Sequence, residues 1–234
     1  MRFWTARTIV WVLLRIILSW VGGIRFEGRE NVPRKGGVLV TPNHFSDGDP
    51  PIIGFALPRA CYFMAKEELF AMKFWGKVIV WLHGFPVKRY TADRAALKRA
   101  ETLLKEGEVV VIFPEGQLSE TGTLQPFLPG VILIAQRAQV PLLPVAMIRV
   151  NEMMPYGELK PRRIRKPLII RFGKPVSAEE LTGGLKGSAG YEKGAERLSQ
   201  MVQALLDDKP YPALEPLAPP QPSVAEKTEE SSAD

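Results

Sequence analysis

Short apolar runs separated by polar turns give this chain the pattern of a protein in which strands and helices alternate. The shorter runs predict strands, which we expect at residues 24–28, 37–40, 60–65, 83–89, 108–113, 141–150 and 168–172. Longer segments between them predict helices at residues 50–57, 70–82, 91–106, 130–139 and 191–206. This alternation predicts an α/β fold, with a mainly parallel central sheet flanked by helices.

Two of these segments also indicate their position in the sheet. The continuous apolar run 108–113 is typical of a buried central strand, whereas Pro86 inside the run 83–89 favours an edge strand. Residues 114–129 form a polar loop, and loops of this length in compact domains are usually functional.

Residues 3–21 form the most apolar helix candidate of the chain. At 1.5 Å per residue such a helix is about 28 Å long, close to the thickness of a bilayer core. Arg7 and Arg15 argue against a simple membrane span, and the tryptophans beside them suit a helix lying in the membrane interface. The alternative is a buried helix of a soluble domain. Residues 70–82, which are apolar nearly all round, are either a core helix or more of this membrane-facing surface.

Charge is unevenly distributed along the chain. The net charge of the 234 residues is +6, but residues 207–234 carry −5, which leaves +11 on the rest. A basic body predicts an anionic partner, such as a membrane surface or a phosphorylated substrate. Nucleic acid is not expected, because no aromatic and basic platform or helix-turn-helix pattern is present. The basic run 160–174 is either a solvated face or a contact for anionic headgroups.

The domain organisation follows from these patterns. Residues 1–23 are predicted to be a membrane anchor helix, and residues 24–208 a single globular domain. Six prolines among acids, serines and alanines after residue 206 predict a disordered tail over residues 209–234. Cys61 is the only cysteine, which excludes an intramolecular disulfide, and with only two histidines the chain has few ligands for a metal.

The candidate chemistry lies in the turn over residues 41–50, between a predicted strand and a predicted helix. His44 lies there, five positions before Asp49. Histidine ordinarily titrates near neutrality, so it can accept a proton from a hydroxyl, and a carboxylate on its other ring nitrogen would orient it and stabilise its positive charge. The alternative is structural, because Asp49 before Pro50 is also a good helix N-cap, and a histidine in a turn is usually solvated.

Three further blocks follow at the ends of predicted strands: Gly-Phe-Pro-Val-Lys-Arg at 84–89, Phe-Pro-Glu-Gly at 113–116 and Val-Pro-Leu-Leu-Pro-Val at 140–145. With Asn43, His44 and Asp49 they appear in the order and spacing of the glycerolipid acyltransferase family, which includes the lysophosphatidic acid acyltransferases. The chain resembles this family over about residues 24–150.

The resemblance implies an acyltransferase on the cytoplasmic face of the cell membrane, monotopic or peripheral. Its donor would be an acyl-CoA or acyl-carrier-protein thioester, and its acceptor a lysophospholipid. The first candidate acceptor is 1-acylglycerol-3-phosphate, which would give phosphatidic acid as the product. His44 would be the general base and Asp49 would orient it. No metal or bound redox cofactor is implied. The substrate-binding residues implied by the family are Asn43, Gly84, Arg89, Glu115, Gly116 and Pro144.

Within the family, the 84–89 block binds the acceptor's phosphate, the 113–116 block shapes the acceptor site, and the 140–145 block is associated with the acyl side. Each of these residues also has a structural alternative to substrate binding. Arg89 could form a surface salt bridge, Glu115 could be a solvated loop acid, and Pro144 could be a strand-edge proline.

The chain departs from the family pattern at two places. Gln117-Leu118-Ser119 stands where members often have Thr-Arg-Ser, and residues 127–129 lack a basic residue often found there. A lysolipid with a larger head group, or a lyso-amino lipid, therefore stays open as acceptor. Two other functions also stay open: a metal-dependent phosphoesterase using His44, Asp47 and Asp49, and a non-catalytic membrane-binding protein.

Overall fold

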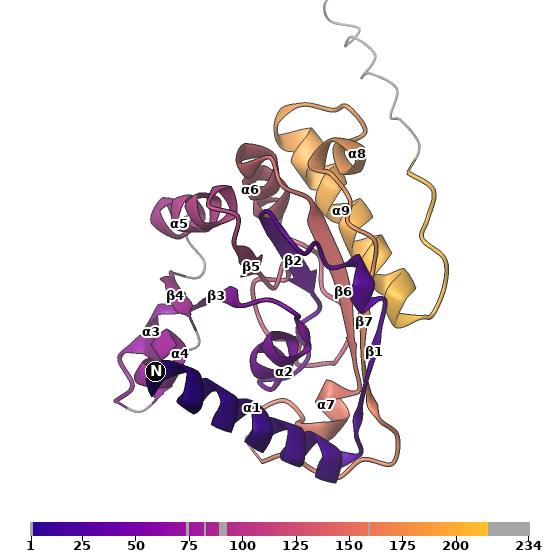
Figure 1. Ribbon diagram of the computed structural model, residues 1–234. Coiled ribbons are helices and arrows are strands. Elements are labelled where there is room, and N and C mark those ends of the chain that lie inside the picture. The colour runs from indigo at the N-terminus through magenta and orange to yellow at the C-terminus, as the bar shows by residue number, and fades with distance from the viewer. Residues whose placement is uncertain (1, 74, 82, 89–92, 159, 215–234) are drawn as a thin grey trace, which may run out of the picture.

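A single sheet forms the centre of the protein. The computed structural model describes residues 2–73, 75–81, 83–88, 93–158 and 160–214, without the side chains of residues 2–11, 75, 78 and 81. Within these residues the strand order is β1-β7-β6-β2-β5-β3-β4 (Figure 1). The strands are β1 (Ile24–Glu27), β2 (Val38–Pro42), β3 (Cys61–Lys66), β4 (Gly84–Val87), β5 (Val109–Val111), β6 (Leu142–Ile148) and β7 (Leu168–Phe172).

All neighbouring strands pair in parallel except β6 and β7, which are antiparallel. The predicted α/β fold with a mainly parallel sheet is therefore confirmed. β5 lies inside the sheet between β2 and β3, and β4 lies at its edge, as the apolar run and Pro86 predict.

Helices cover both faces of the sheet. They are α1 (Arg2–Val21), α2 (Asp49–Ala56), α3 (Glu67–Phe70), α4 (Trp75–Trp81), α5 (Arg94–Lys105), α6 (Gly130–Ala138), α7 (Val150–Met153), α8 (Ala178–Thr182) and α9 (Gly187–Leu206), with a short 3₁₀ helix at Arg29–Asn31. Alternate strand residues face opposite layers. Val38 and Val40 pack into one apolar cluster with α1, α2 and α7, whereas Leu39 packs into a second with α5, α6, α8 and α9.

One face of α1 is packed and the other is exposed. Leu18 and Val21 are buried in the first apolar cluster, which fixes the C-terminal half of the helix to the body of the protein. Among the side chains of the helix that the structure describes, the exposed large apolar ones are Val12, Leu13, Ile16, Ile17 and Trp20. In the described part of the chain, no helix has the length and apolar character needed to cross a membrane.

The single helix predicted over residues 70–82 is wrong, because the chain turns between α3 and α4. The reason lies in the packing of Gly76: a Cβ built there would lie 2.3 Å from the Phe70 carbonyl oxygen, so α4 folds back closely onto the end of α3. The short helices α7 and α8 have no counterpart in the prediction, and α9 begins at Gly187, four residues before the predicted start. Glycines at 187, 190 and 194 weaken the helical signal there.

The C-terminal segment leaves α9 along the second apolar cluster. Tyr211 and Leu214 pack against that cluster, and the Tyr211 hydroxyl occupies the space that a side chain at Gly173 would fill. The predicted disordered tail lies outside the described residues from 215 onward.

The segment that leads into β2 packs closely against the end of α5, and this packing requires glycine at position 37. A Cβ at Gly37 would lie 2.1 Å from the Leu104 carbonyl oxygen at the end of α5, so Gly37→Ala must displace backbone. We expect the substitution to lower the free energy of unfolding by about 1–3 kcal/mol, measured by urea denaturation. Gly130→Ala is the matched control, since no atom lies within 4 Å of its built Cβ. We expect the control to change stability by less than about 1 kcal/mol, and equal losses in both variants would contradict this account.

Candidate active site

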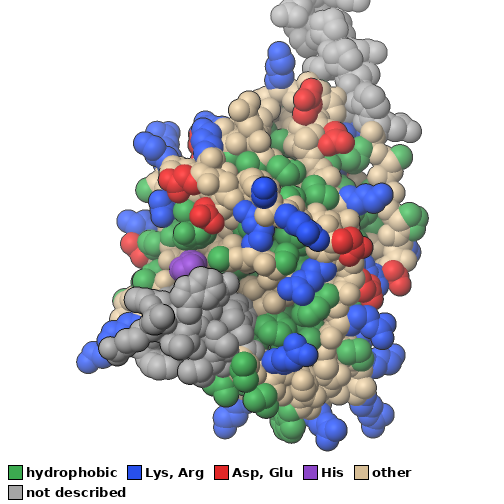
Figure 2. Space-filling model, viewed as in Figure 1, with side chains coloured by type: hydrophobic (Ala, Val, Ile, Leu, Met, Phe, Trp, Pro, Cys, Tyr) green, Lys and Arg blue, Asp and Glu red, His purple; other side chains and the backbone are tan. Residues whose placement is uncertain are grey.

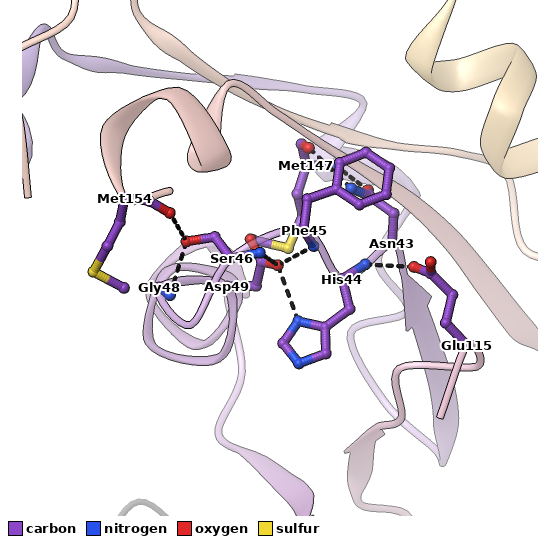
Figure 3. Close-up of polar contacts among 9 residues, drawn as sticks. All are labelled: Asn43, His44, Phe45, Ser46, Gly48, Asp49, Glu115, Met147 and Met154. Atoms are coloured by element: carbon purple, nitrogen blue, oxygen red, sulfur yellow. Dashed lines mark hydrogen bonds and ion pairs between the residues drawn. The ribbon is translucent and has the colours of Figure 1, made fainter. Parts of the chain in front are cut away.

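The site forms at the edge of the sheet where parallel strands end. β2 leads directly into the turn that carries His44, and β5 leads into the segment that carries Glu115. Because β2 and β5 are neighbouring parallel strands, their carboxyl ends bring the two segments together, as is general for open α/β sheets. Figure 3 shows the resulting cluster around His44.

His44 and Asp49 form a buried pair. The His44 Nδ1 atom lies 3.0 Å from the Asp49 Oδ2 atom, and the two residues are 7% and 0% exposed (Figure 3). The backbone N–H groups of Phe45 and Ser46 donate to the same Oδ2 atom at 2.7 Å and 2.8 Å. Asp49 is also the first residue of α2, where the helix dipole favours a negative charge. The other oxygen, Oδ1, has no hydrogen-bond partner among the described residues.

Two effects act on the Asp49 carboxyl. Burial is the larger effect and raises its pKa, and the hydrogen bonds from His44, Ser46 and Phe45 oppose that rise. Three N–H donors around one oxygen are the arrangement that favours a carboxylate. With Asp49 ionised, Nδ1 of His44 is the donor of the pair, and Nε2 is left as the nitrogen that can accept a proton.

Glu115 holds the backbone on both sides of the site. Its Oε1 atom accepts the His44 backbone N–H at 2.6 Å, and its Oε2 atom accepts the Gln125 backbone N–H at 2.9 Å. Burial raises the pKa of Glu115 to about 7, although both backbone hydrogen bonds and the nearby His44 oppose the rise. The Ser119 N–H donates to the His44 carbonyl oxygen at 2.9 Å, so the 114–129 loop contacts both backbone polar groups of the histidine.

Two further contacts fix the histidine turn to other elements. The Asn43 amide donates to the Met147 carbonyl oxygen at 3.1 Å and accepts the Met147 N–H at 2.7 Å, which joins the turn to β6 (Figure 3). The Ser46 hydroxyl donates to the Met154 carbonyl oxygen at 2.8 Å and accepts the Gly48 N–H. The His44 ring stacks on Phe113, with ring centroids 4.0 Å apart.

The structure brings Asn43, His44, Asp49 and Glu115 together in this cluster. Of the other predicted site residues that the structure describes, Gly116 and Pro144 lie on adjoining segments, whereas Gly84 lies on the edge strand β4. Gly116 follows Glu115 with φ of +74°, a conformation that suits glycine. Pro144 lies beside Thr41 in the pairing of β6 with β2. Gly84 is the first residue of β4, so it lies at the amino end of that strand and not at its carboxyl end.

The predictions also named Arg89 and Asp47. Arg89 lies outside the described residues. Asp47, which the phosphoesterase alternative requires, is exposed. Within the described part of the chain, no three or more His, Cys, Asp and Glu side chains are grouped so as to hold a metal ion.

The residues that immobilise the site were not among the predicted site residues. Phe113 had a usable signal, because it directly precedes the Pro-Glu-Gly block at a strand end. Gln125, Met147 and Met154 had none, since they contribute backbone groups, which any residue type could supply.

Comparisons with known proteins agree with the geometry. A family model described as "Acyltransferase" matches residues 23–148. The chain is 37% identical over 196 residues to the 1-acyl-sn-glycerol-3-phosphate acyltransferase of Bacillus subtilis (strain 168), with 82% of this chain and 89% of the relative covered. It is 33% identical over 181 residues to 1-acyl-sn-glycerol-3-phosphate acyltransferase alpha of Mus musculus, covering 73% of this chain and 62% of that longer protein.

A solved structure shows the same fold. The crystal structure of the 1-acyl-sn-glycerophosphate (LPA) acyltransferase from Thermotoga maritima matches with a TM-score of 0.65 at 25% identity, covering 82% of this chain and 74% of that one. These matches agree with the resemblance carried by the four sequence blocks. The chain therefore belongs to the acyltransferase family.

Proposed function

We propose that this protein is a 1-acylglycerol-3-phosphate O-acyltransferase. It moves a fatty acyl group from an acyl-CoA or acyl-carrier-protein thioester to the acceptor hydroxyl, and the product is phosphatidic acid. The observation that carries the proposal is the buried His44–Asp49 pair, in a chain of the acyltransferase family whose named relatives carry this activity.

In this reaction His44 acts as the general base. Its Nε2 atom takes the proton of the acceptor hydroxyl as that oxygen attacks the thioester carbonyl. Asp49 stabilises the imidazolium from the Nδ1 side, and the stacked Phe113 ring holds the plane of the imidazole. The new C–O bond forms as the C–S bond breaks, and the proton passes from Nε2 to the departing sulfur, which leaves as a thiol.

A lysolipid with a larger or less acidic head group is the second candidate acceptor. It is favoured by Leu118 and Leu128, which stand at or near positions where relatives of the family often carry positive charge. Leu128 is 55% exposed, and it lies against the backbone of Gly116, where a built Cβ would meet its Cδ1 atom at 2.7 Å. Fewer cations at this point weaken the attraction for a phosphate dianion.

The exposed apolar face of α1 supports a monotopic or peripheral location on the cytoplasmic face of the cell membrane. The face runs along one side of the helix while Leu18 and Val21 hold the other side to the core. A helix of this kind lies in the plane of the interface with its apolar side among the acyl chains. We therefore assign residues 1–23 to a membrane anchor and residues 24–208 to the acyltransferase domain.

The catalytic pair is tested by His44→Ala and Asp49→Asn. We expect each substitution to reduce acceptor-dependent thiol release from acyl-CoA by about 10²–10⁴-fold, because one removes the base and the other removes the charge that stabilises its protonated form. Release is measured on detergent-purified protein with and without 1-acylglycerol-3-phosphate.

His83→Asn is the control for this pair. His83 is the other histidine, it is exposed, and its φ of +63° suits asparagine. We expect full activity from the control. Unchanged activity in His44→Ala would overturn the assignment, and release with another lysolipid but not with 1-acylglycerol-3-phosphate would select the second acceptor. An absence of release with every lysolipid and both donors would favour a non-catalytic membrane protein.

Glu115 is tested through the pH dependence of stability. Because its pKa in the folded protein is about 7, above the ordinary value of 4.5, the folded state keeps a proton that the unfolded state has lost between those values. Its contribution to the free energy of unfolding therefore falls as pH rises through this range. We expect the stability difference between wild type and Glu115→Gln to shrink by about 1–3 kcal/mol from pH 5 to pH 8, measured by urea denaturation. A difference that stays constant with pH would contradict this.

The apolar face of α1 is tested by Leu13→Ser combined with Ile16→Ser. Both side chains are more than half exposed, so the folded body should tolerate the change. We expect binding to phosphatidylcholine vesicles to weaken by about 10²-fold, because two large apolar side chains no longer enter the bilayer. Activity on a water-soluble short-chain acceptor should stay within about threefold of wild type. Unchanged vesicle binding would exclude this face as the anchor.

A further inference from the structure

A basic segment is fixed against the C-terminal end of α1. The Ile164 N–H donates to the Val21 carbonyl oxygen at 2.7 Å, and the Leu168 N–H donates to the Gly23 carbonyl oxygen at 3.0 Å. The Arg162 N–H donates to the Met153 carbonyl oxygen at 2.7 Å. These bonds tie residues 162–168 to α1 and α7 at several successive points, so the segment is a built part of the fold.

The close fit depends on Gly22. A Cβ there would lie 2.8 Å from the Ile164 carbonyl oxygen, so only glycine lets the segment approach the end of the helix. Ile164 packs against the first apolar cluster, and the neighbouring side chains of Arg163 and Arg165 are exposed. The backbone therefore presents two guanidinium groups from a fixed base.

A cleft of about 620 Å³ lies at this junction. Its lining residues are Ser19, Trp20, Gly22, Arg163, Ile164 and Arg165. Figure 2 shows Lys and Arg side chains around the lower part of the face that carries α1, with the acidic side chains above them. Among the described residues no carboxylate forms an ion pair with Arg163 or Arg165, whereas Arg162 pairs with Glu158.

We propose that this cleft binds the phosphate headgroup of an anionic phospholipid in the bilayer. Guanidinium groups match phosphate oxygens in a bidentate geometry, and an indole suits the boundary between acyl chains and headgroups. Trp20, which is 58% exposed, belongs both to the apolar face of α1 and to the cleft. When that face enters the bilayer, the cleft lies at the depth of the headgroups.

The headgroup site is separate from the proposed catalytic site, although it rests on the proposed membrane contact of α1. None of its lining residues belongs to the turn that carries His44. The lipid it holds is a component of the surrounding membrane, and its charge decides which membranes the enzyme prefers. The alternative role for the two arginines is to offset the negative end of the α1 dipole.

The test compares vesicle binding by Arg163→Gln/Arg165→Gln with a control of equal charge change, Lys98→Gln/Arg99→Gln. The control pair is exposed on α5, away from the C-terminal end of α1 (Figure 1). Affinity is measured by sedimentation with phosphatidylcholine vesicles, with and without phosphatidylglycerol. We expect the cleft variant to lose roughly tenfold in affinity for the anionic vesicles and to bind pure phosphatidylcholine like wild type. The control should lose less than about threefold on either vesicle.

Four outcomes would overturn the proposal. Equal losses in both variants would assign the preference to net charge. A matching loss on pure phosphatidylcholine would show that the cleft does not select anionic lipids, and a lowered melting temperature would assign the arginines to the stability of α1. Loss of the anionic preference on adding inorganic phosphate, at constant ionic strength, would indicate a site for free phosphate. Thiol release with a soluble short-chain acceptor is measured in parallel, so that failure of the proposed reaction is seen separately from failure of the cleft.

Discussion

The site depends on the burial of one carboxylate. Asp49 is fully enclosed, and a buried charge is stable only when donors surround it. The chain meets part of this demand locally, with two backbone N–H groups and one imidazole nitrogen on Oδ2, whereas Oδ1 has no partner among the described residues. The turn must therefore adopt one conformation, which places the histidine ring in one orientation. The geometry of the proposed base follows from the cost of leaving this carboxylate without partners.

The rest of the fold supports the turn from several directions. The sheet brings the end of β5 beside the end of β2, and Glu115 then accepts the backbone N–H of His44. On the other side, the Asn43 side chain forms two hydrogen bonds with β6 and so continues the pairing beyond the last residue of β2. Each support comes from a different part of the chain, so the turn is fixed only in the complete domain.

Local patterns predicted much of this structure, and distant contacts explain what they missed. Strand alternation, the central position of β5 and the edge position of β4 follow from apolar runs and one proline. The His44–Asp49 pair is only five residues apart, so its spacing is readable in the sequence. The contact of Glu115 with His44 spans 71 residues and uses a backbone group, which leaves no side-chain signature. The break between α3 and α4 likewise depends on how closely Gly76 meets Phe70.

The 114–129 loop has one more consequence for the proposed base. It holds both backbone polar groups of His44, the N–H through Glu115 and the carbonyl through Ser119. A movement of this loop away from the turn would break both bonds and release the backbone of His44. The position of the loop and the position of the proposed base are therefore coupled.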